Sequence, residues 1–211
     1  MRVAGECLTI KRDRPSAFGN SATNRFQGQN FVKYNLDRHH RQSIRLKGYD
    51  YSLTGAYFIT LCTHQRECLF GEIVDGEMRL NELGQVVADV YLWLATQYSY
   101  VHLDAWIVMP NHLHGILVLT GDPRRGVSRN APTEDATKRK SLGRLIGAFK
   151  TVFTKRINLI QSTSGSLVWQ RNYYEHIVRN EKSLHDIRQY IHHNPISWQQ
   201  DQLHPDHPSK W

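Results

Sequence analysis

The sequence predicts an antiparallel α+β sandwich, and three observations carry that prediction. Short runs of β-branched and aromatic residues, typical of strands, are interleaved with longer amphipathic stretches typical of helices. Two-residue turn signals join neighbouring strand-like runs, which favours hairpins and therefore antiparallel pairing. At 211 residues the chain is long enough for one domain with a single hydrophobic core.

Most of the strands are expected between residues 56 and 120. Residues 56–63 are β-branched and aromatic and predict the first strand. Residues 71–80 place Asp75-Gly76 between two strand-like runs, a pattern typical of a tight hairpin. Two further strands, over 100–108 and 112–120, are expected on either side of a turn at Pro110-Asn111.

Three helices are expected between and after these strands. Apolar residues repeat at intervals of three and four over 82–97, which predicts an amphipathic helix. Ser141 could cap a second helix that runs to about residue 160. A third helix should begin near Ser183 and end near Asn194, because Pro195 disfavours the helical conformation of the residue before it. Residues 167–170 could form a short strand or an extended anchor.

Three segments lack a periodic pattern and are expected outside the regular elements. Residues 1–47 are predicted to be a mobile basic arm, and residues 121–140 a flexible insertion loop. The folded domain is therefore expected over 48–198, with a polar tail over 199–211.

The charge of the chain indicates a polyanionic partner. Its formal net charge is +8 and its isoelectric point is near 9.5. The arm holds ten basic and three acidic residues, and the helix predicted after Ser141 holds four basic residues and no acid. The four candidates for contacts to a phosphate backbone are Arg144, Lys150, Lys155 and Arg156. The sequence lacks an apolar run long enough to span a bilayer and a secretory signal, so we expect a cytoplasmic protein with no membrane partner.

A pair of histidines on the strand over 112–120 predicts a metal site. Side chains alternate between the two faces of a strand, so His112 and His114 should project to one side while Leu113 enters the core. We expect Gly115 to leave room beside the two imidazoles. Two ligands do not complete a site for a divalent ion, so a third must come from another part of the chain.

Residues 108–116, Val-Met-Pro-Asn-His-Leu-His-Gly-Ile, resemble the His-hydrophobic-His signature of the HUH single-strand transposases, an IS200-like superfamily. The branch most similar to this chain is that of the REP-associated tyrosine transposases. The resemblance extends from about Tyr51 to Trp198 and includes Trp169-Gln170 and the run Tyr190-Ile-His-His-Asn-Pro195. It implies a ferredoxin-like, or RRM-like, sandwich with helices packed on an antiparallel sheet.

The resemblance also implies roles for two residues of the last helix. Tyr190 takes the position of the nucleophile, and Asn194 that of a third metal ligand after His112 and His114. Residues four apart lie on one helical face, so both side chains could face one ion. Without the resemblance, Tyr190 would be assigned to the core and Asn194 to a helix C-cap. Two rival nucleophiles are Tyr173 and Tyr174.

The activity implied is cleavage and strand transfer of single-stranded or hairpin DNA, through a covalent 5′-phosphotyrosine, with Mg²⁺ or Mn²⁺ as cofactor. The implied target is a REP hairpin with an adjacent tetranucleotide. Aromatic side chains could stack on its unpaired bases or belong to the core, and the candidates are Trp169, Tyr173 and Tyr174. The sequence leaves open a monomer or a homodimer.

Two other functions remain open from the sequence. One is a domesticated protein that binds hairpin DNA and regulates without cutting it. The other is a metal-dependent nuclease in which water replaces the tyrosine. Retention of His112, His114 and Tyr190 argues against loss of catalysis.

Overall fold

A computed structural model of the protein describes residues 45–121, 139–162, 165 and 167–207. The predicted basic arm over 1–47, apart from its last three residues, and the loop over 122–138 lie outside the described residues. Residues Ser43–Trp211 form one compact unit. Within its described part, no helix is both long and apolar enough to cross a bilayer.

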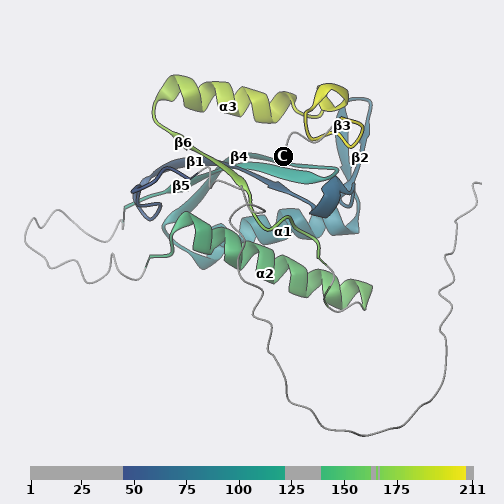
Figure 1. Cartoon of the computed structure of the whole chain (residues 1–211), viewed down its shortest axis with the longest axis horizontal. Helices are drawn as coiled ribbons and strands as arrows, with labels where there is room; N and C mark the ends of the chain where they lie inside the picture. Colours follow the sequence, from purple (N-terminus) through teal and green to yellow (C-terminus); the bar gives the residue numbers. More distant parts are fainter. Residues whose placement is uncertain (1–44, 122–138, 163–164, 166, 208–211) are drawn as a thin grey trace, which may run out of the picture. The chain divides into compact units, whose positions relative to one another are not determined.

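A four-stranded antiparallel sheet forms the centre of this unit (Figure 1). Its strands are β1 (Gly55–Cys62), β4 (Val101–Met109), β5 (His112–Leu119) and β6 (Tyr174–Val178), in the order β4-β5-β1-β6. Helix α1 (Glu82–Gln97) precedes β4, and helix α2 (Leu142–Gln161) lies between β5 and β6 in the chain. The resulting β-α-β-β-α-β succession with this strand order is the ferredoxin-like arrangement that was expected.

Smaller elements complete the unit. Strands β2 (Gly71–Val74) and β3 (Glu77–Leu80) form a separate hairpin. Its turn residues Asp75 and Gly76 have φ of 54° and 77°, as the Asp-Gly signal predicted. Helix α3 (Glu181–His193) follows β6, and two short 3₁₀ helices span His64–Arg66 and Trp198–Gln200.

The helices cover opposite faces of the sheet. Helices α1 and α2 lie on one face and α3 on the other (Figure 1). Alternating side chains of β1 follow this division, with Tyr57 and Ile59 in the large core under α1 and α2. Phe58 points the other way and packs with Ile116 and Ile191 beneath α3. Both faces of the sheet are therefore buried, but the core under α3 is much smaller.

An ion pair joins α3 to the sheet. Arg188 on α3 donates two hydrogen bonds to Asp104 of β4, from Nε to Oδ1 over 2.7 Å and from Nη2 to Oδ2 over 2.6 Å. This bidentate geometry fixes the orientation of both side chains. It lowers the pKa of Asp104, chiefly through the hydrogen bonds from the guanidinium.

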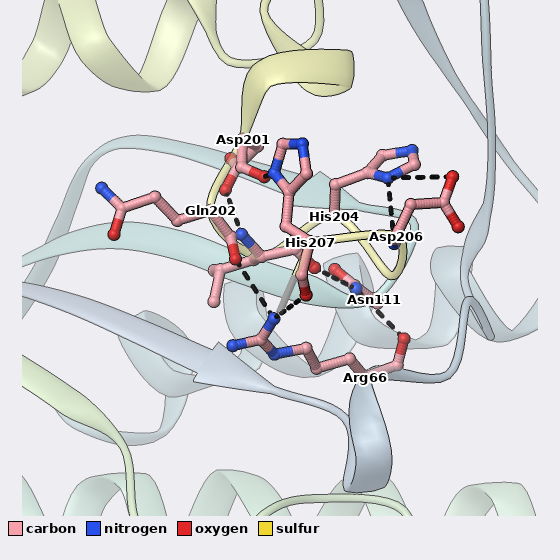
Figure 2. A network of polar contacts seen from close by, with 8 residues as sticks. Arg66, Asn111, Asp201, Gln202, His204, Asp206 and His207 are labelled. Atoms are coloured by element: carbon pink, nitrogen blue, oxygen red, sulfur yellow. Dashed lines mark hydrogen bonds and ion pairs between the residues drawn. The ribbon is translucent and has the colours of Figure 1, made fainter. Parts of the chain in front are cut away.

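Residues 199–207 belong to the fold rather than to a free tail, so the boundary expected after Trp198 falls inside the compact unit. We call them the C-terminal strap. Arg66 Nη1 donates to the carbonyl oxygens of Gln202, over 3.2 Å, and His207, over 3.4 Å (Figure 2). Asn111 Nδ2 donates to the carbonyl oxygen of Leu203 over 2.8 Å. The strap is thus held against the turn that precedes β5.

Strand β6 was not predicted from the sequence. Residues 167–170, for which a short strand or an extended anchor was expected, form the anchor: Trp169 pairs with Thr63 in an isolated bridge, and the Gln170 amide donates to the Cys62 carbonyl. Strand β6 lies at the edge of the sheet and begins with Tyr174 and a buried Glu175, so it lacks the apolar pattern of the other strands.

Gly115 serves the core under α1 rather than the histidine pair. A Cβ atom at this position would lie 2.2 Å from the Tyr91 hydroxyl oxygen and 2.7 Å from its Cζ atom. Tyr91 is fully buried on α1. The expectation that Gly115 makes room beside the imidazoles is therefore wrong, because successive residues of β5 point to opposite faces.

We predict that Gly115→Ala destabilises the protein by about 1–3 kcal/mol, because the new methyl group overpacks the site of the Tyr91 ring. Gly147→Ala is the matched control: this glycine is exposed in the middle of α2, and no atom lies within 4 Å of its added Cβ. Higher helix propensity should make the control up to about 1 kcal/mol more stable. Urea unfolding of both variants measures these changes, and a fully stable Gly115→Ala would contradict the packing described for Tyr91.

Candidate metal centre

His112 and His114 lie side by side on the α3 face of β5. Strand β5 is flanked by β4 and β1, so both residues stand in the interior of the sheet. Their side chains are 0% and 2% exposed, and their ring centroids are 4.4 Å apart. Leu113 between them enters the opposite core, as strand alternation predicted.

Hydrogen bonding determines which nitrogen of His112 is available. Its Nδ1 lies 2.7 Å from Oδ1 of Asn111. The Asn111 amide is oriented by its own Nδ2, which donates to the carbonyl oxygens of Arg66 and Leu203. Because Oδ1 can only accept, Nδ1 carries the hydrogen and Nε2 retains a lone pair. This Nε2 is buried and has no hydrogen-bond partner among the described residues.

His114 is held between the sheet and α3. Its Nδ1 lies 2.8 Å from the Thr60 hydroxyl oxygen, and its Nε2 lies 3.2 Å from the hydroxyl oxygen of Tyr190. Phe58 stacks on the imidazole with a centroid distance of 5.5 Å. These contacts fix the plane of the ring, as surrounding hydrogen bonds do for metal-binding histidines in general.

Both imidazoles are neutral at physiological pH. Burial lowers the pKa of His112 to about 3, and the neighbouring Asn194 side chain offsets only part of this effect. Burial, and then the proximity of His112, lowers the pKa of His114 well below its usual value. The neutral imidazole is the form that binds a metal ion, so no proton needs to be displaced near pH 7.

Asp201 of the C-terminal strap lies close to the histidine pair. One ligand atom from each of His112, His114 and Asp201 lies within 4.8 Å of the other two. The Leu203 amide donates to its Oδ1 over 2.7 Å, and Asn194 Nδ2 donates to its Oδ2 over 3.0 Å. Two imidazoles and a carboxylate are a suitable ligand set for a divalent ion.

Asp201 is not among the site residues predicted from the sequence, because it lies in the polar tail expected over 199–211. The alternation of acids and histidines in Asp201-Gln-Leu-His-Pro-Asp-His207 was a signal that could have drawn attention to it.

Asn194 also points to this site. It follows the last residue of α3, is 2% exposed, and its Oδ1 is buried with no hydrogen-bond partner in the described part of the chain. Two buried lone pairs, on His112 Nε2 and Asn194 Oδ1, therefore lack a partner. Leaving such atoms unpaired costs free energy, and a cation would supply the missing partner, so the residues present fit a metal ion.

Tyr190 is the tyrosine that α3 places at the histidine pair. Its side chain is 47% exposed, yet its hydroxyl reaches His114 and its ring meets Phe58 edge-on. Burial of the hydroxyl raises the pKa of Tyr190 to about 12, with a smaller contribution from the charge of Asp201. The phenol is therefore protonated at neutral pH.

Neither of the two other tyrosine candidates has a hydrogen bond to the histidine pair among those found in the described part of the chain. Tyr173 packs against the large core, and its hydroxyl accepts a hydrogen bond from Arg45 over 2.8 Å. Tyr174 is on the same side of the sheet as Tyr190 and is 44% exposed, with its ring 6.1 Å from that of Phe58.

Trp169 is not available to stack on a base. It is 4% exposed and packs among Phe70, Phe149 and Phe153 of the large core. The expectation of a DNA contact there is wrong, because apolar neighbours already cover the indole ring. The sequence does not reveal which aromatic side chains a helix will cover.

The predicted basic residues lie on α2, which covers the sheet face opposite to Tyr190 (Figure 1). Lys150 donates to the carbonyl oxygens of Gln170 and Asn172, over 2.7 and 3.3 Å, and thus holds the segment before β6. The other three are exposed to solvent: Arg144, Lys155 and Arg156.

Sequence comparison identifies a relative of which nearly the whole length aligns with this chain. A protein of Haemophilus influenzae described as uncharacterized is 42% identical over 180 residues, which cover 83% of this chain and 99% of the relative. No family model matches the chain.

Structure comparison aligns two solved structures with part of this chain. A REP-associated tyrosine transposase bound to a REP hairpin aligns with 75% of this chain and 74% of its own, at 19% identity and a TM-score of 0.49. A proposed transposase of Deinococcus radiodurans aligns with 70% of this chain and 95% of its own, at 21% identity and a TM-score of 0.39.

We predict that the buried His112 makes the metal-free protein less stable as the pH falls. Its pKa is about 3 in the folded state and about 6.5 in the unfolded chain, so between these values the unfolded chain binds one more proton. Between pH 6 and 5, His112→Gln should therefore lower the pH dependence of the free energy of unfolding by about 1 kcal/mol per pH unit.

Urea unfolding in EDTA at several pH values measures this slope. The control is His102→Gln, the same substitution at an exposed histidine of β4. Equal slopes for wild type and His112→Gln would show that this imidazole is not kept neutral by the fold.

Proposed function

We propose that this chain, which belongs to the same protein family as the Haemophilus influenzae relative, is a metal-dependent tyrosine transposase that cuts and rejoins single-stranded DNA. The observation that carries this proposal is the hydroxyl of Tyr190, 3.2 Å from Nε2 of His114 within a buried histidine pair. A phenol next to a divalent metal site is the pairing that the His-hydrophobic-His resemblance implies.

The proposed ligands of Mg²⁺ or Mn²⁺ are His112, His114 and Asp201, with Asn194 as a further oxygen donor. When bound, such an ion would polarise a non-bridging oxygen of the phosphate and neutralise charge that develops in the transition state. His112 presents its Nε2 lone pair because Asn111 holds the other nitrogen. Asn194 orients the Asp201 carboxylate by donating to its Oδ2.

Tyr190 is the proposed nucleophile. Its oxygen forms a bond to phosphorus while the bond from phosphorus to the 3′ oxygen breaks, which leaves a 5′-phosphotyrosine and a free 3′-hydroxyl. The phenolic proton leaves Tyr190, and the departing 3′ oxygen takes up a proton. The reverse attack by another 3′-hydroxyl joins new ends without ATP.

The hydrogen bond between the Tyr190 hydroxyl and Nε2 of His114 bears on metal binding, because the same nitrogen cannot take part in this hydrogen bond and hold a metal ion. If Nε2 of His114 held a metal ion, the Tyr190 hydroxyl would lose this hydrogen bond and could turn toward a phosphate. Because burial raises the pKa of Tyr190 to about 12, the attack needs a cation or a base close to the phenol.

Single-stranded or hairpin DNA is the proposed substrate. The net charge of +8 favours a polyanion. The half-exposed Tyr190 can reach a phosphate that an unpaired strand brings to the surface of α3. A REP-type hairpin is the target that the sequence resemblance favours.

The proposal predicts a covalent protein–DNA adduct that survives denaturation. Labelled hairpin oligonucleotides with single-stranded flanks are incubated with Mg²⁺ or Mn²⁺ and resolved on a denaturing gel. Tyr190→Phe should form no adduct and should retain binding, because it loses only the attacking oxygen. Tyr174→Phe, which alters the neighbouring half-exposed tyrosine in the same way, should form the adduct at the wild-type level.

The other outcomes of this gel identify the alternatives. An adduct formed by Tyr190→Phe would contradict the assignment of the nucleophile. Cleavage without an adduct would indicate a hydrolytic nuclease. Binding by the wild type without cleavage would indicate a DNA-binding regulator.

The role of Asp201 has a separate test in the affinity for Mn²⁺, measured by calorimetry without DNA. We expect Asp201→Asn to weaken binding by about 10–100-fold, because the site loses its carboxylate. Asn194→Ala should have a smaller effect, since it removes a neutral oxygen and one hydrogen bond to Asp201. Asp206→Asn is the control in the same strap, because that side chain is 88% exposed. Equal affinity for wild type and Asp201→Asn would exclude the carboxylate as a ligand.

A further inference from the structure

We infer that the cavity between β6 and α3 binds one unpaired base of the DNA strand, next to the phosphate that Tyr190 attacks. This inference rests on the proposed function. The cavity has a volume of about 520 Å³ and opens to solvent. Phe58, Tyr174, Ile187 and Tyr190 supply its apolar lining. Its size lies within the range of cavities that hold small organic ligands.

The register of the sheet places this cavity beside the metal centre. Tyr174 of β6 is paired with Thr60 of β1, and Thr60 is paired with His114 of β5. The three residues are thus lateral neighbours on one face of the sheet. Two strand spacings, about 10 Å, separate the backbone of Tyr174 from that of His114. A nucleotide whose phosphate lies at Tyr190 would therefore place its base over Tyr174.

The aromatic residues of the cavity are arranged to accept a flat group. Phe58 is buried, and its ring lies 6.1 Å from both Tyr174 and Tyr190, edge-on to each. Tyr174 and Tyr190 are the only aromatic side chains among the large apolar residues that the described part of the chain leaves exposed. Both line this one cavity. Exposed aromatic rings in a groove are the usual stacking surfaces for unpaired bases.

The polar groups around the cavity favour a nucleotide over an apolar ligand. His176, Lys182 and Asp186 lie at its lining, and all three are exposed. Lys182 can meet a backbone phosphate, while Asp186 can accept a hydrogen bond from an amino group of a base. Stacking on Tyr174 requires an unpaired base, because a duplex presents only the edges of its bases.

The test measures how the loss of one base and the loss of the Tyr174 ring affect each other. An oligonucleotide is selected from a random pool for binding to Tyr190→Phe, which keeps every ring of the cavity. Versions with a single abasic site at each position in turn are then titrated by fluorescence anisotropy. We expect one abasic position, next to the cleavage site, to raise the Kd about tenfold.

Tyr174→Ala, combined with Tyr190→Phe, should raise the Kd for the intact oligonucleotide by a similar factor. In this variant the abasic site should have little further effect, because the ring that the base would stack on is gone. Tyr174→Phe keeps the ring and should behave as the parent protein does. The inference is overturned if no oligonucleotide binds, if no abasic position stands out, or if the sensitive position stays equally sensitive in Tyr174→Ala.

This outcome is separate from that of the adduct gel. If the wild type forms an adduct but the effects on Kd of Tyr174→Ala and of every abasic site are independent, only the base site is rejected. Coupling without any adduct would leave the base site in place and reject the transposase. The two failures are therefore distinguishable.

Discussion

The hydrogen bond between Asn111 and Nδ1 of His112 is the interaction on which the candidate site depends. It fixes the tautomer of a buried imidazole, so that a lone pair rather than a hydrogen faces Asp201 and Asn194. The Asn111 amide in turn joins the carbonyl of Arg66, from a 3₁₀ helix, to that of Leu203 in the C-terminal strap. Three segments far apart in the sequence thereby meet at one side chain. Asn111 therefore has two connected roles, because the side chain that holds the strap also orients the imidazole of the proposed ligand His112.

The two faces of the sheet differ: one packs the large apolar core, and the other carries the candidate metal site. The face under α1 and α2 carries the large apolar core, where even a single added methyl group at Gly115 would collide with Tyr91. The opposite face carries the imidazoles, and its own apolar cluster is built on only Phe58, Ile116 and Ile191. Because strand alternation assigns successive residues to opposite faces, the short segment from His112 to Ile116 serves both purposes. The basic residues of α2 stand on the core side, and direct contact between them and a phosphate at Tyr190 would require the DNA to pass around the edge of the sheet.

Local patterns allowed much of this arrangement to be predicted from the sequence. The apolar periodicity predicted α1 over the residues that it occupies, and strand alternation predicted that His112 and His114 lie on one face. Both patterns depend only on residues that are close in the sequence. The contribution of Asp201 could not be predicted in this way, since it depends on how Arg66 and Asn111 hold a segment without periodicity. The sequence left open whether Trp169 stacks on a base or lies in the core, because a tryptophan fits both equally well. Only the packing of Phe149 and Phe153 decides between them. Strand β6 was missed because an edge strand with a charged residue carries little apolar pattern.

The small cluster beneath α3 has a consequence for motion. Besides the apolar contacts of that cluster, α3 is held by the hydrogen bond between Tyr190 and His114 and by the bidentate pair of Arg188 and Asp104. This ion pair is partly open to water and therefore weaker than a buried pair. A helix so attached can detach as a cooperative unit at a lower free energy than global unfolding requires. The sheet would remain folded, with its imidazoles in place, while the phenol swings out with the helix. Such partial opening would let a long polymer enter sideways, without having to be threaded through the site.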